Sequence, residues 1–235
     1  MHHVLLDRWS QGESPLHHRD PRAKIPVLAL FLVALAITPV RDYLAIGVEA
    51  ALLLTGILVS GLPFFGILLR AMAVLPFSVT FGLMSWIAGE PERAIALVAK
   101  SYLSTLAVLL IVGTTPLPRL LAGMEALGAP RLLVLVAQFL YRYLFVISEQ
   151  AQHMRLAASC RQGPVDHHRP RFRAAAGALA VLFARSYLRA EGIHRAMMAR
   201  AFTGRFLALD SLRFDFRDGL FLAGLTVFLG LVLTL

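Results

Sequence analysis

Apolar residues occur in five long runs separated by short polar breaks. Each run has roughly 16 to 23 residues, close to the ~20 that an α-helix needs to cross the ~30 Å hydrocarbon core of a bilayer. The runs cover residues 25–40, 43–62, 66–88, 94–113 and 219–235. Proline, glycine and charged residues mark the breaks, as in helices joined by hairpin turns in a membrane. The pattern predicts an all-α, polytopic integral membrane protein with about five transmembrane helices.

Polar residues between the fourth and fifth runs recur with helical spacing. Gln138, Arg142, Glu149 and His153 follow one another at intervals of four or seven residues, and apolar residues occupy the other sides. This periodicity predicts one long amphipathic helix from about residue 131 to about residue 163, where glycine and proline end it.

Two more helices complete this stretch, and the chain divides into four parts. A second long amphipathic helix is expected over roughly residues 173–203, and a short apolar helix over 118–127. The long helices are too apolar on one side to stand free in water, so they require a cover. The four predicted parts are a polar lead-in at 1–24, a four-helix transmembrane region at 25–113, a domain of long amphipathic helices at 114–218 and a C-terminal transmembrane helix at 219–235.

Composition agrees with a membrane protein. The chain has 235 residues, of which 58% are hydrophobic and 16% charged, and its mean hydropathy is +0.70. These values exclude a soluble globule, which could not bury so much apolar surface, and also a disordered chain. A single cysteine, Cys160, excludes a disulfide-stabilised scaffold.

The net charge of +9 is concentrated in one block. Residues 114–218 carry 15 arginines and 7 acidic residues, whereas the rest of the chain has 8 basic and 7 acidic residues. A basic block between hydrophobic regions is typical of a cytoplasmic segment that lies near an anionic lipid surface. The distribution therefore argues against binding to nucleic acid.

The short connections predict a cytoplasmic N-terminus. Arg19, Arg22 and Lys24 precede the first run, whereas the turn at residues 89–93 is net negative. Four crossings then return the chain to the cytoplasm at Thr114, which agrees with the basic block. The lead-in lacks the pattern of a cleavable signal peptide. We therefore expect a multi-pass protein of the cell inner (cytoplasmic) membrane.

Three charged residues lie within the apolar runs. A central charge in a membrane helix costs on the order of 2.5 to 3.5 kcal/mol. Arg70 and Lys100 are close to predicted span ends, so their side chains are expected to extend to the interface. Glu49 either does the same or lines a contact with a partner subunit. Asp20, before Pro21, is expected to cap the first helix.

No catalytic or metal-binding constellation is evident in the sequence. His17-His18 and His167-His168 are adjacent pairs in polar stretches, whereas chelation on a helix requires a spacing of three or four, so they are expected to be solvated. Cys160 has no evident base beside it. The chain has no G-x-x-x-x-G-K-[ST] loop, so it is not expected to hydrolyse ATP. We predict a non-catalytic protein with no cofactor and no metal.

Several short motifs occur in a fixed order along most of the chain. They are Asp20-Pro-Arg-Ala-Lys24, Thr114-Thr-Pro116, Leu127-Gly-Ala-Pro130, Tyr141-Arg142 followed by Glu149, and two arginine motifs near helix ends. Together they resemble the transmembrane T component of energy-coupling factor (ECF) transporters, the CbiQ (cobalt-type) and EcfT family.

This resemblance implies a transport function. A T component is a membrane scaffold that joins two cytoplasmic ATPase (A) subunits to a membrane subunit (S) that captures the substrate. ATP-driven motion then passes through the long cytoplasmic coupling helices to the membrane helices. The resemblance to CbiQ favours cobalt ion as the substrate, and nickel or a vitamin is the alternative.

The resemblance also implies which residues bind the ATPases. The family motif is a small residue, arginine and glycine, and the matching positions are Cys160-Arg161-Gln162, followed by Gly163, and Ala199-Arg200-Ala201. The central arginine is present in both motifs, whereas glutamine and alanine replace the glycine.

The residue chemistry supports the same assignment. An arginine flanked by small residues can approach a partner closely and pair with a carboxylate or with helix carbonyls. Met154, Met197 and Met198 would supply a flexible apolar surround. The alternative is that Arg161 and Arg200 are solvated residues that interact only with the helix dipole.

Two other functions are compatible with a small membrane protein. A membrane-embedded lipid-modifying enzyme would need clustered carboxylates or a nucleophile with its base, and the acidic residues of the basic block are scattered. A self-sufficient carrier would need inverted repeats and interrupted helices. We expect a T component to co-purify with an ATPase, and either rival to be isolated alone.

Overall fold

The structure of the chain, a computed structural model, describes residues 9, 12, 14–161, 168–204 and 215–234. All regular elements in these ranges are helices, which confirms the predicted all-α fold. The elements are α2 (Pro21–Ile37), α3 (Tyr43–Ser60), α4 (Phe64–Ala71), the 3-10 helix η1 (Met72–Val74), α5 (Leu75–Ile87), α6 (Pro91–Gly113), α7 (Leu117–Ala126), α8 (Arg131–Arg161), α9 (His168–Ala199) and α10 (Phe216–Thr234).

The chain packs as two compact units. The first unit comprises Met1–Ala129 and Asp210–Leu235 and contains helices α2 to α7 and α10. The second unit, Pro130–Leu209, contains the long helices α8 and α9. Packing thus groups α7 with the apolar helices, although the charge pattern grouped it with the long amphipathic ones.

Each of the five apolar runs forms a helix or a helix pair, as predicted. Among the described residues, four segments are long and apolar enough to cross a membrane: Tyr43–Ser60, Phe64–Ile87, Pro91–Gly113 and Arg131–Arg161. α2, with 17 residues, and the apolar segment Asp218–Phe228 of α10 are shorter. The protein is therefore a multi-pass membrane protein. By length and composition α8 also qualifies, although its charge pattern predicts a cytoplasmic helix.

The third apolar run is not one continuous helix. It forms α4 and α5, which are separated by the 3-10 turn η1. Pro76 has no N–H to donate to the carbonyl of Met72, and the N–H of Leu75 binds that carbonyl instead. The proline therefore accounts for the break.

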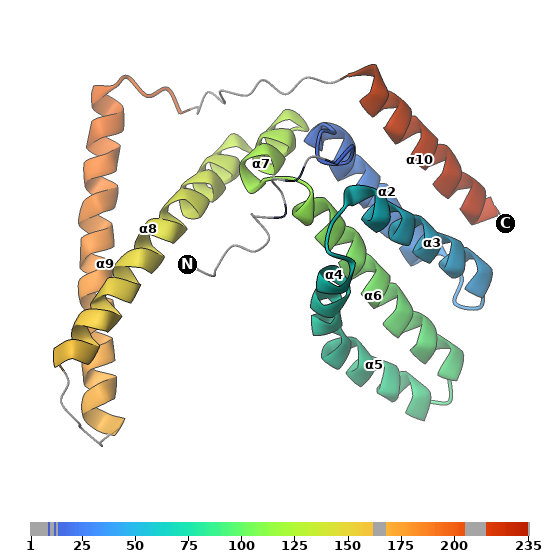
Figure 1. Ribbon diagram of the computed structural model, residues 1–235, viewed down its shortest axis with the longest axis horizontal. Helices are drawn as coiled ribbons and strands as arrows, with labels where there is room; N and C mark the ends of the chain where they lie inside the picture. Colours follow the sequence, from blue (N-terminus) through green and yellow to red (C-terminus); the bar gives the residue numbers. More distant parts are fainter. Residues whose placement is uncertain (1–8, 10–11, 13, 162–167, 205–214, 235) are drawn as a thin grey trace. The chain divides into compact units, whose positions relative to one another are not determined.

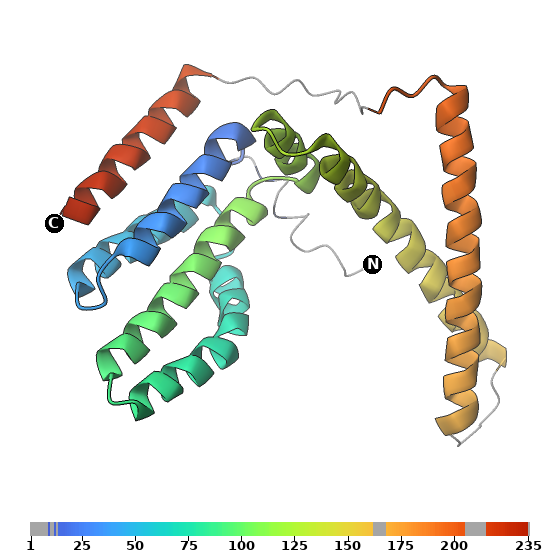
Figure 2. The ribbon, with the colours of Figure 1, turned by 180° about the vertical axis from the view of Figure 1, so that it is seen from behind.

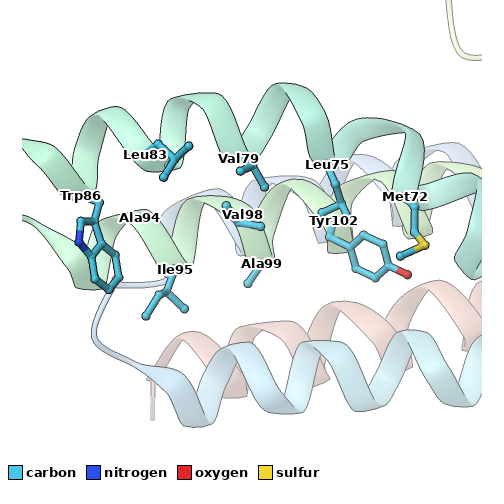
Figure 3. A pocket seen from close by; sticks show the side chains of 11 residues that line it. Met72, Leu75, Val79, Leu83, Trp86, Ala94, Ile95, Val98, Ala99 and Tyr102 are labelled. Atoms are coloured by element: carbon cyan, nitrogen blue, oxygen red, sulfur yellow. The ribbon is translucent and has the colours of Figure 1, made fainter.

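α6 is at the centre of the first unit, where it contacts α2, α3, α4 and α5 (Figures 1 and 2). Buried side chains from α2, α3, α4 and α6, including Phe31, Ile57, Ile67 and Leu106, form its core. α5 and α6 form a hairpin with an apolar groove of about 540 Å³ between them, lined by residues such as Trp86 (Figure 3).

The outer face of α5 is apolar and exposed. Phe77, Phe81, Met84 and Ile87 have between 48% and 84% of their surface accessible. Such a continuous apolar face would be unfavourable in water and suits contact with lipid.

Candidate functional site

The first arginine motif lies at the end of α8. Cys160 and Arg161 are the last two residues of the helix, and both are exposed. Arg161 lines a cleft of about 680 Å³ between α8 and α9, as does the half-buried Met154. A guanidinium in the last turn also interacts favourably with the negative end of the helix dipole. Gln162 and Gly163 lie outside the described residues.

The second arginine motif closes α9 with a Schellman cap. The helix ends one residue before Arg200, and Ala201 has a φ of 53°, in the left-handed region. The N–H of Ala201 donates to the carbonyl of Met198 over 3.1 Å, and the N–H of Phe202 donates to the carbonyl of Met197 over 3.1 Å. These two hydrogen bonds define the Schellman motif, in which the residue at the position of Ala201 is usually glycine.

The same cap occurs with glycine at the end of α7. Gly128 has a φ of 101°, and its N–H donates to the carbonyl of Glu125 over 3.1 Å. The N–H of Ala129 donates to the carbonyl of Met124 over 3.0 Å. The comparison gives a backbone reason for a small third residue in the second arginine motif. A side chain in the left-handed region is unfavourable, and alanine has the smallest one.

The two arginine motifs lie at opposite ends of the α8/α9 pair. The cleft beside Arg161 is lined by the middle of α9, from Ala178 to Arg189, against the second half of α8. Met197, near the end of α9, instead faces the first half of α8, in an apolar cleft of about 360 Å³ that includes Phe139. The helices therefore run antiparallel, as Figure 1 also shows, and the structure does not bring the two motifs together.

The three predicted methionines have different surroundings. Met154 and Met197 are half-buried and line the polar and the apolar cleft, respectively. Met198 is 62% exposed beside Arg200 and lines neither cleft. Flexible apolar surface therefore accompanies both motifs.

The polar cleft has a positive lining. Arg161, Arg185 and Arg189 contribute three guanidinium groups, all on exposed residues. Glu149 is the one acidic residue among the described residues of the lining, and its carboxylate is 3.7 Å from the Nε2 of His153. The cleft therefore favours a partner with negative charge.

In the first unit, two of the sequence motifs meet. Asp20 caps α2 by accepting a hydrogen bond from the N–H of Arg22 over 2.8 Å, as predicted. The buried Nζ of Lys24 donates to the carbonyl of Thr114 over 3.1 Å and to the hydroxyl of Thr115 over 2.8 Å. Lys24 thus fixes the start of α2 to the point where the chain leaves α6.

Sequence reasoning did not predict this contact. The signal was present in the topology, because an even number of crossings places residue 24 and residue 114 on the same side of the membrane. Which side chains then meet there depends on how the helices pack.

The charged residues of the apolar runs have protein partners. Glu49 is fully buried, and its Oε1 accepts a hydrogen bond from the hydroxyl of Thr38 over 3.0 Å. Lys100 donates to the carbonyl of Thr38 over 2.6 Å, at the end of α2. The guanidinium of Arg70 lies 3.9 Å from the ring centroid of Trp9, a cation–π contact. Lys100 and Arg70, which were expected to extend to the membrane interface, therefore each contact a protein group.

The expectation that His17 is solvated is wrong. His17 is 8% exposed, and its ring nitrogens lie 2.6 Å from the hydroxyl of Ser14 and 2.9 Å from the carbonyl of Trp9. Through these two contacts, the buried ring of His17 stabilises the turn that precedes α2. Within the described ranges, no group of three or more His, Cys, Asp or Glu is arranged to hold a metal ion.

The fold and these motifs define a class of protein: a multi-pass helical membrane protein with a second unit of two long helices, each with an exposed arginine at its C-terminal end. The family model CbiQ, described as a cobalt transport protein, matches residues 12–208. The chain therefore belongs to the CbiQ family of transport proteins, which confirms the resemblance seen in its motifs.

Two relatives extend this comparison. The energy-coupling factor transporter transmembrane protein EcfT of Bacillus selenitireducens is 27% identical over an alignment that covers 86% of this chain and 84% of that protein. The cobalt transport protein CbiQ of Rhodobacter capsulatus is 29% identical over 121 residues, which cover 52% of this chain and 49% of that protein.

Proposed function

We propose that this chain is the transmembrane coupling (T) subunit of an ECF-type importer. In this proposal, α8 and α9 bind two cytoplasmic ATPase subunits, and the first unit holds a substrate-binding membrane subunit. ATP-driven movement passes from the second unit to the first and leads to uptake of cobalt ion. The chain itself performs no catalysis.

The observation that carries the proposal is the position of the two arginines. An exposed arginine is the last residue of α8 and another directly follows α9, and the two arginines lie at opposite ends of the helix pair. Two separate docking points suit two ATPase subunits. Truncation of an interface arginine often costs about 2 kcal/mol or more, because its partner's charge loses its counterpart.

The charge at the first docking point supports an acidic partner surface. Three arginines line the cleft beside the end of α8. The planar guanidinium group pairs with carboxylates through two parallel hydrogen bonds, so the ATPase is expected to offer an Asp or Glu side chain here.

The proposed orientation places the N-terminus and the second unit in the cytoplasm. The basic block at residues 114–218 then lies beside the anionic lipids of the inner membrane, and the exposed apolar face of α5 lies in its hydrocarbon core. Cysteine accessibility at each loop would test this orientation.

Cobalt is proposed as the cargo on the basis of the family. The matching family model and one relative are both described as cobalt transport proteins. The S subunit would select the ion. Uptake of radiolabelled Co²⁺, compared with Ni²⁺, by cells that express the complete transporter tests this part. Preferential Ni²⁺ uptake would contradict it.

The docking role is tested by a double substitution, Arg161→Ala with Arg200→Ala. The matched control is Arg155→Ala with Arg195→Ala, which removes one exposed arginine from each of the same helices outside the motifs. We expect the docking variant to remain in the membrane but to lose co-purifying ATPase and uptake, while the control keeps both.

The outcome also separates the rival functions. Retained ATPase and uptake in the docking variant would refute the docking role. An unmodified chain that is isolated alone, with no ATPase, would overturn the T-subunit proposal and favour a self-contained membrane protein such as a lipid-modifying enzyme.

A further inference from the structure

Residues 19–24 lie at the start of α2 and contact the α6/α7 region and α10, the parts of the first unit that flank the second unit in the sequence. The chain leaves the first unit after α7, and α10 is the first described element after the second unit. Both α7 and α10 pack against α2. The covalent route from the second unit to the membrane helices therefore runs through the chain before α10 and after α7.

On the α7 side the contact is buried and polar. Lys24 is 1% exposed, and its ammonium group holds the carbonyl of Thr114, the C-cap of α6, and the hydroxyl of Thr115. α7 begins two residues later and then approaches α2 closely. A Cβ atom on Gly123 would lie 2.7 Å from the Cβ of Pro21. These contacts leave little room for α7 to move independently of α2.

On the α10 side the contact is an ion pair. The Nη1 of Arg19 lies 3.4 Å from the Oδ1 of Asp218, whose side chain is 5% exposed. The Oδ2 of Asp218 also accepts a hydrogen bond from the N–H of Asp215 over 3.2 Å, which closes the first turn of α10. The guanidinium of Arg19 lies 5.8 Å from the ring centroid of Phe221. One carboxylate thus joins the start of α10 to the start of α2.

α2 in turn belongs to the core of the first unit. Phe31 and Leu35 are 3% exposed and pack in the same cluster as residues of α3, α4 and α6. Because packed helices move as units, a displacement of the start of α2 is passed along the helix to its far end.

We propose that residues 19–24 form an N-terminal clamp that passes movement of α7 and α10 into α2. Arg19 and Lys24 of the clamp, with their partners Asp218 and Thr115, are positioning residues for energy coupling. They bind neither the ATPase nor the substrate. This inference rests on the proposed function, since it needs a nucleotide-driven movement of the second unit.

The test uses the complete complex of the chain with its ATPase pair and S subunit in lipid nanodiscs. A genetically encoded fluorescent amino acid replaces Ile37, which is 64% exposed at the far end of α2. Its emission reports movement of α2 on addition of ATP, whichever substrate is transported. ATP hydrolysis and ATPase co-purification are measured on the same samples.

Three clamp variants are compared. Asp218→Arg is expected to reduce the ATP-dependent emission change at least fivefold, and the charge swap Arg19→Asp with Asp218→Arg to recover at least half of it. Thr115→Val, which removes one acceptor of Lys24 at nearly constant volume, should lower the change at least twofold. ATP hydrolysis should stay within twofold of the unmodified complex in all three.

The matched control is Arg41→Glu. Arg41 forms an exposed ion pair of 2.7 Å with Glu92 in the first unit and follows the end of α2 that is opposite to the clamp. Its reversal should leave the emission change intact. If Asp218→Arg does not assemble, the milder Thr115→Val carries the test.

The outcomes distinguish the two proposals. An unmodified complex with bound ATPases but no emission change, or clamp variants with a full change, would overturn the clamp and leave the T-subunit role standing. If the charge-swap variant is as defective as Asp218→Arg, the ion pair contributes only to local packing, and the clamp proposal is overturned as well. Failure of the unmodified chain to bind ATPases would remove both proposals.

Discussion

The backbone N–H of Phe202 donates to the carbonyl of Met197 over 3.1 Å, and this bond turns the chain back across the end of α9. The turn places Arg200 at the C-cap, where its side chain is exposed. It also forces Ala201 into the left-handed region, with a φ of 53°. The presentation of the second arginine motif is therefore a property of the local backbone.

Replacement of Ala201 by glycine should stabilise the protein. Glycine adopts the left-handed conformation without the steric cost of a Cβ atom, which is about 1 kcal/mol. We expect an increase of about 1 kcal/mol in the free energy of unfolding, or a higher melting temperature of the detergent-solubilised protein. The control is Ala199→Gly, inside the helix, which should destabilise it by about 0.5 to 1 kcal/mol. Destabilisation by both changes would contradict the cap.

Replacement of Gly123 by alanine should weaken the contact between α7 and α2. The new methyl group would lie 2.7 Å from the Cβ of Pro21, so one helix must shift. Overpacking of this kind costs about 1 to 3 kcal/mol. Gly47→Ala is the matched control, because a Cβ atom there meets nothing within 4 Å. Equal melting temperatures for the two variants would show that α7 and α2 are not in close contact.

Replacement of Thr38 by valine should destabilise the first unit. The hydroxyl of Thr38 is the hydrogen-bond partner of the buried Glu49 Oε1, and valine has a similar volume but no hydroxyl. A buried group left without a partner costs about 1 to 3 kcal/mol. Thr38→Ser keeps the hydroxyl and should lose much less. Thermal unfolding in detergent distinguishes them, and equal losses would point to the methyl group rather than to the hydrogen bond.

Single substitutions of the two arginines should each remove one ATPase. Arg161 and Arg200 lie at opposite ends of the α8/α9 pair, so the loss of one leaves the other's surroundings unchanged. Native mass spectrometry without nucleotide should give two ATPase subunits per unmodified chain, one for either single variant and none for the double variant. Release of both subunits by one substitution would show that the two docking points are a single site.

Much of the fold follows from patterns that are local in the sequence. The five apolar runs predict the helices of the first unit other than α7, and Asp20 before Pro21 predicts the start of α2. The arginine motifs are found by their small neighbours and their positions near helix ends. Pro76 is evident in the sequence of the third run, but only the structure shows that the run divides there into α4 and α5.

Other features are not local. The charge pattern places α7 with the long amphipathic helices, yet α7 packs on α2, where Gly123 allows a close approach to Pro21. The charge pattern groups Lys24 with the basic residues before the first span. In the structure its side chain is buried and donates hydrogen bonds to Thr114 and Thr115.

The sequence by itself determined that this chain is an all-helical membrane protein of the CbiQ family, because hydrophobic length, charge bias and short motifs act over a few helical turns. The tertiary structure decided which polar groups meet: Lys24 with Thr115, Arg19 with Asp218, and Glu49 with Thr38. Partners between 11 and 199 positions apart are selected by helix packing, in which a buried charge or hydroxyl must find a hydrogen-bond partner, and no local pattern specifies which one.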